Sequence, residues 1–182
     1  MWHCPNAFRC PSSPSRLLNL PARTHLAFTS YFYPYIHQTS YNMSSLASCI
    51  FCKIIKGEIP SMKLLETETV FAFMDIGPIA RGHCLVIPKY HAEKLTDLPD
   101  EQMADILPTC RKLAKATGAE NFNILQNNGR PAHQIVDHVH FHVIPKPAEA
   151  GDKEGLVVGW PTQKDLSKDD IAKIFEEMKS KL

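Results

Sequence analysis

The chain has 182 residues, which is enough for one domain with a substantial core and too few for two. Its 20 Lys and Arg residues almost balance 19 Asp and Glu residues, and the net charge of +1 argues against general binding to nucleic acid or a membrane surface. No apolar run reaches the length of a membrane span. Six irregularly spaced cysteines indicate a reduced compartment, so we expect a cytoplasmic protein, with the nucleus as a second location.

The first 45 residues differ in composition from the rest of the chain. They contain Arg9, Arg16 and Arg23 but no acidic residue and no lysine, and prolines interrupt every helical or strand period. This composition is typical of a mitochondrial transit segment, although the prolines disfavour the amphipathic helix that such a segment needs. The alternative is a stretch upstream of a true start at Met43. Either way we expect a disordered extension over 1–45 and one domain over 46–182, with a mitochondrial location only if the extension is a transit segment.

After a short helical turn that closes at Gly57, hydrophobic patterning predicts five strands and two helices. The first helix is expected over 96–118, bent at Pro108 because proline blocks a backbone hydrogen bond. The second is an amphipathic C-terminal helix with Ser167 as its N-cap, packed on the sheet edge or on a second copy. The expected strands lie within 58–66, 70–76, 83–88, 121–128 and 138–145. This order indicates an α+β fold, an antiparallel meander sheet with one long helix packed on it.

The last expected strand, "HVHFHVIP", alternates imidazole with apolar side chains. Because successive strand residues point to opposite faces, the three histidines are expected on one face and the three apolar side chains in the core. Exposed strand faces normally carry Thr, Lys, Glu or Ser, so three imidazoles there by chance is the weaker explanation. The residues concerned are His138, His140 and His142 on one side and Val139, Phe141 and Val143 on the other.

Two functions fit three imidazoles on one face. One is chelation of zinc by His-x-His, and the other is nucleophilic attack by one neutral imidazole that its neighbours orient. The preceding loop, "QNNGRPAHQ", is rich in amide donors, which suit phosphate oxygens better than they suit a metal shell. We therefore favour the nucleophile, and no metal is needed for that chemistry because neighbouring donors can stabilise the phosphoryl oxygens.

These residues resemble the histidine triad (HIT) family, whose signature is His-x-His-x-His-x-x with apolar spacers. "HVHFHVI" (138–144) matches the signature, "FAFMDIGPIARGHCLVIPKYH" (71–91) resembles the upstream block, and "CIFCKIIKGEIP" (49–60) resembles the start of the family domain. The three blocks stand in the family order over about 43–165. The sequence is most similar to the branch of histidine triad nucleotide-binding proteins.

The resemblance implies a homodimeric α+β fold and a hydrolase that cleaves AMP-linked phosphoramidates through a nucleotidyl-histidine intermediate. It implies that His140 is the nucleophile, that the carbonyl of His138 fixes its tautomer, and that His142 and His83 support the site. A purine nucleotide is then the expected partner. The residues expected to bind it are Phe73, Asp75, Ile76, Asn127, Gln134 and His142.

The chain departs from the family pattern in the loop before the triad. Ile135 stands where many relatives have Ser or Thr, so a hydroxyl that assists the leaving group is absent. His133 stands where glycine is frequent, so the backbone of the phosphate loop is expected to differ. Trp160 resembles a C-terminal tryptophan that reaches the site of the partner subunit, although the segment before it is longer in this chain.

The pair Cys49 and Cys52 forms a CxxC, which alone is a weak metal signal because two further ligands are needed for a closed zinc site. Some members of the family complete such a site with a histidine from "PKxH" and with the first histidine of the triad. The equivalents are His91 and His138, so the resemblance implies a structural zinc, against free thiols as the alternative.

Two other functions are compatible with the sequence. The same fold supports a dinucleoside polyphosphate hydrolase, whereas the presence of His142 argues against the transferase branch, which has glutamine there. A nucleotide-sensing scaffold with incidental hydrolysis would use the same groove. Turnover of an AMP–amine conjugate distinguishes the phosphoramidase from the scaffold.

Overall fold

The computed structural model describes residues 43–151, 153–159 and 161–182. The expected disordered extension therefore lies outside the described residues up to position 42, and so does Trp160. Helix α1 begins at Met43, three residues before the expected domain boundary. Within the described part of the chain, every helix is too short or too polar to cross a bilayer.

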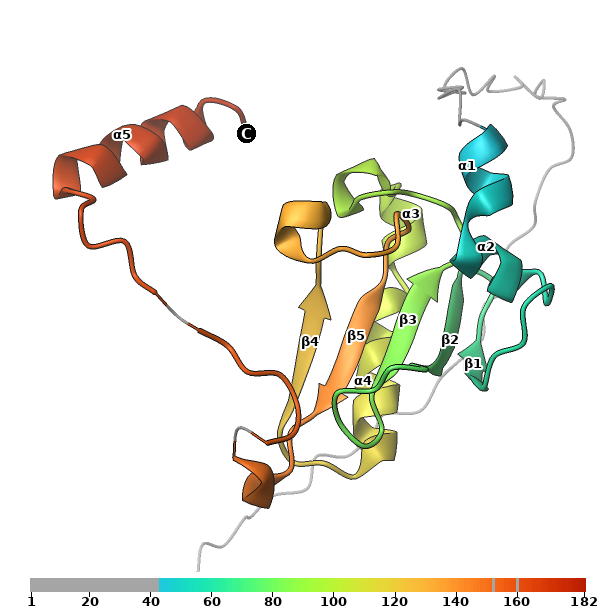
Figure 1. Ribbon diagram of the computed structural model, residues 1–182. Coiled ribbons are helices and arrows are strands. Elements are labelled where there is room, and N and C mark those ends of the chain that lie inside the picture. The colour runs from blue at the N-terminus through green and yellow to red at the C-terminus, as the bar shows by residue number, and fades with distance from the viewer. Residues whose placement is uncertain (1–42, 152, 160) are drawn as a thin grey trace, which may run out of the picture. The chain divides into compact units, whose positions relative to one another are not determined.

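Five antiparallel strands form one sheet (Figure 1), and all five lie within the expected segments. The first three strands form the expected meander. After the long helix, however, β4 takes the outer edge and β5 inserts between β3 and β4, so the order in the sheet is β1-β2-β3-β5-β4. The strands are β1 (Lys63–Glu66), β2 (Val70–Met74), β3 (Cys84–Pro88), β4 (Phe122–Gln126) and β5 (Phe141–Pro145).

Each face of the sheet is covered by a helix, which explains why β2 and β3 read as continuous apolar runs. On one face, α4 (Ile106–Thr117) covers alternate residues of these strands, among them Val70 and Val86. On the other face, α2 (Ile50–Ile55) covers the intervening residues, among them Phe73 and Leu85. The α2 face also holds the site described below.

The expected helix over 96–118 is broken rather than bent. A 3-10 turn at Leu95–Asp97 and the short α3 (Asp100–Met103) precede α4, which begins only at Ile106. Pro108 therefore lies in the first turn of α4, where the backbone N–H that proline lacks has no partner within the helix. The prediction of a bend was wrong because the effect of a proline depends on which turn it occupies.

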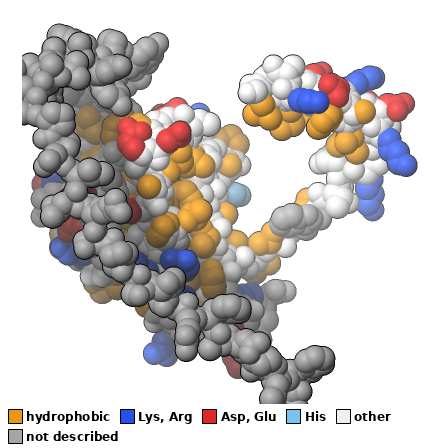
Figure 2. Space-filling view, turned by 180° about the vertical axis from the view of Figure 1, so that it is seen from behind, with side chains coloured by type: hydrophobic (Ala, Val, Ile, Leu, Met, Phe, Trp, Pro, Cys, Tyr) orange, Lys and Arg blue, Asp and Glu red, His pale blue; other side chains and the backbone are white. Residues whose placement is uncertain are grey.

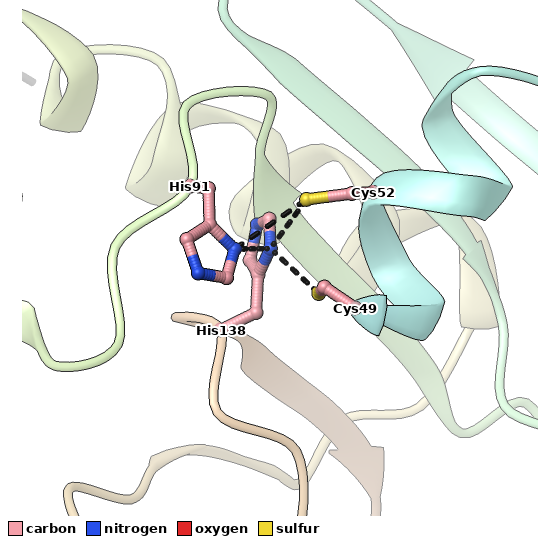
Figure 3. A group of neighbouring side chains, drawn as sticks. All are labelled: Cys49, Cys52, His91 and His138. Atoms are coloured by element: carbon pink, nitrogen blue, oxygen red, sulfur yellow. Dashed lines mark hydrogen bonds between the residues drawn. The ribbon is translucent and has the colours of Figure 1, made fainter. Parts of the chain in front are cut away.

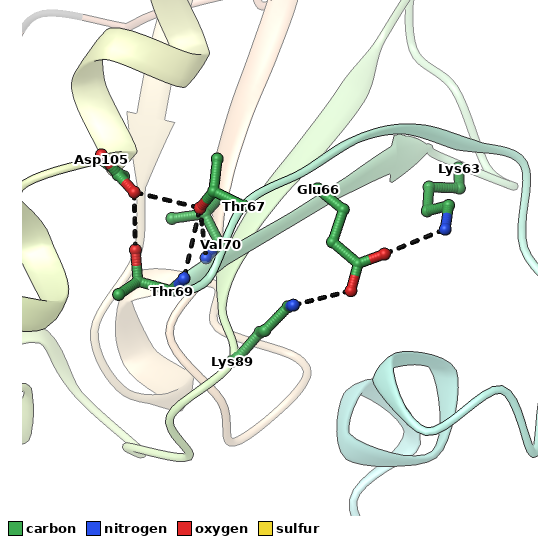
Figure 4. Close-up of polar contacts among 7 residues, drawn as sticks. All are labelled: Lys63, Glu66, Thr67, Thr69, Val70, Lys89 and Asp105. Carbon is green, nitrogen blue, oxygen red and sulfur yellow. Dashed lines mark hydrogen bonds and ion pairs between the residues drawn. The ribbon is translucent and has the colours of Figure 1, made fainter.

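The residue before α4 ties the β1–β2 turn to the helix (Figure 4). A carboxylate oxygen of the half-buried Asp105 accepts hydrogen bonds from the hydroxyls of Thr67 (3.0 Å) and Thr69 (2.9 Å). The Thr67 hydroxyl in turn accepts from the backbone N–H of Thr69 and of Val70, which closes the turn. Nearby, Glu66 pairs with both Lys63 and Lys89 on the surface, an arrangement that contributes little to stability.

The C-terminal helix α5 (Lys168–Lys179) begins at Ser167, whose hydroxyl accepts from the backbone N–H of Asp170, as expected for an N-cap. None of the residues of α5 is buried, so the helix is not packed on the sheet edge of its own chain. Hydrophobic side chains gather along one side of it (Figure 2). The exposed apolar residues at helical spacing are Ile171, Ile174, Phe175 and Met178.

Candidate active site

The alternation of the histidine stretch is present as predicted, but β5 begins only at Phe141, so His138 and His140 lie in the segment that leads into it. Val139 and Val143 are fully buried in the core under α4. His140 and His142 face the α2 side, where the ring of Phe51 lies 5.3 Å from that of His140. Both His138 and His140 are buried, which differs from the open polar face that the sequence suggested.

The hydrogen bonds of His140 define which of its nitrogens is reactive. Its Nδ1 lies 2.7 Å from the backbone oxygen of His138, and because a carbonyl can only accept, Nδ1 carries the proton. In a neutral ring the lone pair is then on Nε2. The ring lines a pocket, so the structure presents an uncharged imidazole with a fixed tautomer as a nucleophile.

A second chain of contacts sets the tautomer of His142. The backbone N–H of Ile79 donates to Nδ1 of His83 (3.3 Å), so the proton of His83 is on Nε2. That N–H donates to Nδ1 of His142 (2.9 Å), with a carboxylate oxygen of Asp75 at 3.5 Å. His142 must then carry its own proton on Nε2, and this N–H is the donor that the ring offers to the pocket.

Burial keeps these rings neutral at physiological pH. It lowers the pKa of His142 to about 4, helped by the neighbouring rings of His140 and His83. It also lowers the pKa of His140 and of His83 below the ordinary value of 6.5, although Asp75 opposes the shift in both. A neutral His140 is the form that can attack an electrophile, so the electrostatics agree with the hydrogen bonds.

The pocket beside these rings has a volume of about 300 Å³, which is at the small end of ligand sites. His140 and His142 line it together with Phe73, Asp75 and Ile76, so the structure brings together most of the residues expected to bind a nucleotide. The opposite wall comes from α2. Its residues, which were not expected from the sequence although they stand in the apolar stretch "CIFCKII", are Ile50, Phe51 and Ile54.

Two of the residues expected to contact the nucleotide, Gln134 and Asn127, do not line this pocket. Gln134 is fully buried, and its amide oxygen accepts from the N–H of Gly129 (2.5 Å) while its nitrogen donates to the carbonyls of Glu93 (2.6 Å) and Val136 (3.1 Å). Asn127 donates to the carbonyl of His133 at 3.4 Å. Neither is among the described residues that line the pocket. The structure thus gives both side chains a role in holding the loop, where the sequence predicted contact with the ligand.

The loop brings two unexpected side chains to the pocket. His133 and Ile135, the two positions where the chain departs from the family pattern, both line it and are both exposed. His133 has φ 64° and ψ 23°, a left-handed conformation that favours glycine or asparagine. The predicted difference in loop backbone is therefore a left-handed histidine at the mouth of the pocket.

Next to His140, four side chains converge from distant segments (Figure 3). Nδ1 of His138 lies 3.5 Å from Sγ of Cys49, 3.6 Å from Sγ of Cys52 and 3.1 Å from Nδ1 of His91. Nδ1 of His91 lies 3.4 Å from Sγ of Cys52. Bond lengths of zinc to nitrogen and sulfur imply separations of about 3.3 Å between two nitrogens and about 3.5 Å between nitrogen and sulfur in a tetrahedral site, and these distances agree closely.

The protons in this cluster also suit a metal. Nε2 of His138 lies 2.9 Å from the carbonyl oxygen of Pro88, so the proton is on Nε2 and the lone pair of Nδ1 points into the cluster. Burial lowers the pKa of His138 to about 4 and raises the pKa of Cys52 to about 12. Without a cation the buried thiol stays protonated, and a metal would supply the charge that stabilises the thiolate. The predicted ligand set fits zinc.

Comparison with known proteins agrees with this geometry. Residues 56–149 match the family profile described as the HIT domain. The chain is 58% identical over 135 residues to an adenosine 5'-monophosphoramidase of Schizosaccharomyces pombe, a match that covers 74% of this chain and 98% of the relative.

Two solved structures resemble the described fold. The crystal structure of a histidine triad nucleotide-binding protein from Candida albicans has a TM-score of 0.68 and 52% identity, and the match covers 74% of this chain and 96% of that one. A Zn-bound histidine triad family protein from Mycobacterium smegmatis has a TM-score of 0.55 and 34% identity, with 72% and 99% covered.

Proposed function

This chain belongs to the HIT domain family, and we propose that it hydrolyses AMP-linked phosphoramidates to AMP and a free amine. The observation that supports this most directly is the protonation of His140, whose Nδ1–H is held by the carbonyl of His138 so that Nε2 is free to attack. Relatives named adenosine 5'-monophosphoramidases at 52–58% identity support the substrate class.

In the first step, Nε2 of His140 attacks the α-phosphorus of the conjugate, a P–N bond to the ring forms, and the P–N bond to the amine breaks. The Nε2–H of His142 donates to a phosphoryl oxygen and stabilises the charge that develops there. The leaving amine takes up a proton from a water molecule. The hydroxide that remains attacks the phosphorus of the nucleotidyl-histidine, the P–N bond to the ring breaks, and AMP and the neutral ring are formed.

The nucleoside is proposed to bind in the apolar part of the pocket. Phe51 and Phe73 offer aromatic surface for a base, and the carboxylate of Asp75 is an acceptor suited to ribose hydroxyls. Asp75 already accepts from the N–H of Gly77 through one oxygen (2.8 Å), which leaves the other oxygen beside Nε2 of His83. We assign no nucleotide contact to Gln134.

Release of AMP from AMP–NH₂ tests the proposal, with native protein compared against His140→Asn. Native protein is expected to turn over, and the variant is expected to bind AMP but to release less than about a thousandth as much product, because covalent catalysis is lost. Binding of AMP by the native protein without turnover would support the nucleotide-sensing scaffold. Faster hydrolysis of diadenosine tetraphosphate than of AMP–NH₂ would support the dinucleoside polyphosphate hydrolase.

We also propose that Cys49, Cys52, His91 and His138 hold a structural zinc ion. The tetrahedral separations and the orientation of Nδ1 of His138 support it. Zinc would anchor the residue whose carbonyl positions His140, without touching the nucleophile itself. Treatment with a chelator should therefore lower the melting temperature, and added zinc should restore it. If the cysteines are free thiols, neither treatment should change the melting temperature.

A homodimer is the proposed assembly. Strand β4 lies at the edge of the sheet with Phe122 and Ile124 exposed at 43% and 41%, and α5 carries an unburied apolar side. A second copy is the occupant that would cover both surfaces, since unprotected strand edges with apolar side chains tend to associate. Light scattering of the native protein and of Ile124→Lys tests this, because the variant should be monomeric if the edge is the interface. The buried free cysteines Cys84 and Cys110 are consistent with a cytoplasmic location, which we also propose.

A further inference from the structure

The hydrogen bond that sets the tautomer of His83, and through it that of His142, begins on the loop 77–82 between β2 and β3. The donor is the backbone N–H of Ile79, 3.3 Å from Nδ1 of His83. Of the residues in this loop only Ala80 is buried, and a glycine stands at each end. A segment with so little packing of its own is easily displaced, so the place of the donor depends on contacts from outside the loop.

Those contacts come from the segment that follows β5. A carboxylate oxygen of Glu154 accepts from the backbone N–H of Arg81 (2.6 Å). The backbone N–H of Gly155 donates to the carbonyl of Ile79 (2.9 Å). Ile79 therefore has its N–H on the ring of His83 and its carbonyl on the segment that contains Glu154.

This segment is itself fixed to the end of β5. The ammonium group of Lys146 donates to the carbonyl of Glu154 (2.9 Å). Gly155 has φ 85°, and a β-carbon there would lie 2.9 Å from Cδ of Lys146 and 3.1 Å from the carbonyl oxygen of Pro145. Glycine is thus required for the close approach. Because β5 also carries His142, the strand and the loop that act on this ring are joined by the same segment.

The bond between His83 and His142 can run in two directions. In the direction described above, Nε2–H of His83 donates, and His142 keeps a proton on Nε2. In the reverse direction, Nδ1–H of His142 donates, and its Nε2 offers a lone pair, which cannot stabilise a phosphoryl oxygen. The Ile79 N–H selects the productive direction. Asp75 favours it more weakly, since 3.5 Å is long for a hydrogen bond.

We propose that Glu154 is a positioning residue for the reaction. By holding Arg81 it keeps the loop in place, so that the Ile79 N–H stays on His83. His142 then keeps its Nε2–H as a donor to the substrate. Glu154 is not among the described residues that line the pocket, so it acts through the loop and touches no reacting atom. This inference rests on the proposed phosphoramidase activity and adds to it a residue outside the pocket.

Hydrolysis of AMP–NH₂ by Glu154→Ala tests the proposal. The variant should fold, because the bond to Arg81 lies at the surface, and its melting temperature checks this. Loss of one donor to a developing oxyanion lowers kcat by about a hundredfold or more, and a partial loss should lower it about tenfold with little change in KM. Glu154→Gln keeps an acceptor oxygen and should recover most of the rate. Glu149→Ala removes the same charge from an exposed position of the same segment and should have native kcat.

The tautomers provide a readout that a loss of stability alone would not change. Two-dimensional NMR of protein with ¹⁵N-labelled histidine distinguishes protonated from bare ring nitrogens. Native His142 should have a proton on Nε2, and in Glu154→Ala part of the population should have it on Nδ1. His138 and His140 serve as internal controls, because backbone carbonyls of Pro88 and His138 hold their protons and neither belongs to the loop.

Each failure has a distinct meaning. If Glu154→Ala has native kcat, or if its kcat falls while the tautomer of His142 is unchanged, the positioning role is refuted and the phosphoramidase stands. If Glu154→Gln loses as much rate as Glu154→Ala, the hydrogen bond to Arg81 is not the cause, and the proposal is also refuted. If native protein releases no AMP from AMP–NH₂, the proposed function fails, and an unchanged tautomer in Glu154→Ala would refute the positioning role separately.

Discussion

Replacement of Gln134 by alanine distinguishes a role in binding the nucleotide from a role in holding the loop. The sequence predicted contact with the nucleotide, whereas the structure shows a fully buried amide with three hydrogen bonds, at 2.5, 2.6 and 3.1 Å. Each bond contributes about 1 kcal/mol net, and partners left unpaired in a buried site add to the loss. We therefore expect Gln134→Ala to lower the free energy of unfolding by about 3 to 4 kcal/mol.

Urea denaturation followed by fluorescence or circular dichroism measures this loss. With a slope of about 2 kcal/mol per molar urea, typical of a small domain, the midpoint should fall by roughly 1.5 to 2 M. Gln126→Ala, at the end of β4, is the matched control. Its amide also makes three hydrogen bonds, donating to the Asn127 carbonyl (3.0 Å) and to Oδ1 of Asn128 (3.2 Å) and accepting from Nδ2 of Asn128 (2.6 Å), but those with Asn128 are exposed to water, which can replace them. That variant should cost less than about 1 kcal/mol.

Kinetics of the same variants complete the comparison. As long as Gln134→Ala remains folded at the assay temperature, the KM for AMP–NH₂ should change less than the stability does, since the side chain does not line the pocket. A variant that unfolds at the native urea midpoint but has a KM raised tenfold or more would refute this reasoning. Gln134 would then contact the nucleotide, as the sequence suggested.

Two more predictions concern the protonation of His140 and His142 and the polar contacts before α4. Burial lowers the pKa of His140 and brings that of His142 to about 4, so kcat/KM should fall on the acid side with an apparent pKa below the ordinary 6.5 of histidine. A profile from pH 4 to 8 whose acid limb has an apparent pKa of 6.5 or more would contradict the neutral-ring assignment. Asp105→Ala removes the acceptor for Thr67 and Thr69 and should lower the free energy of unfolding by about 2 kcal/mol, measured by urea titration. Asp105→Asn keeps an acceptor oxygen and should lose less. Equal losses in the two variants would show that the charge of Asp105, rather than its hydrogen bonds, stabilises the fold.

The elements that were predicted correctly are those set by local pattern. The apolar runs of β2 and β3 alternate between two buried faces. Val139 and Val143 lie in the core, on the side opposite to His140 and His142, as the alternation of the sequence predicted. The break before α4 was missed because Asp105 interacts with a turn 36 to 38 residues earlier, and no local pattern reports such a contact. The insertion of β5 between β3 and β4 is likewise decided by tertiary pairing.

In the site, too, some features follow from local spacing and others depend on tertiary contacts. The spacing of His140 and His142 shows that their rings are neighbours, and their centroids are 5.0 Å apart. It does not show which nitrogen carries a proton, since this depends on the carbonyl of His138 and on the N–H of Ile79. The buried place of Gln134 depends on Glu93, 41 residues away. Resemblance to a family supplied roles for the rings and the bond between His140 and the carbonyl of His138, and the packed structure adds the tautomers of His83 and His142.

The tautomers also decide between two clusters that contain similar donors. Asp75, His83 and His142 bring three ligand atoms within 4.8 Å of one another, as the cysteine cluster does with four. In the first cluster, however, the Ile79 N–H occupies Nδ1 of His83, so Nε2 carries a proton and has no lone pair for a metal. In the second, the Pro88 carbonyl holds the Nε2 proton of His138 and leaves Nδ1 free.

For the described part of the chain we therefore expect one tightly bound zinc rather than two, because of these two clusters only the one with the cysteines offers lone pairs that point inward. Metal analysis after dialysis against a modest excess of zinc measures the stoichiometry, and a Cys49→Ser, Cys52→Ser double variant removes the thiolates while leaving the Asp75 cluster intact. Two ions on the native chain, or one retained by the double variant, would mean that His83 gives up its bond with Ile79 to bind metal. The hydrogen bond from Nε2 of His83 to Nδ1 of His142, which keeps the proton of His142 on Nε2, would then be lost whenever zinc is present, and zinc would inhibit turnover.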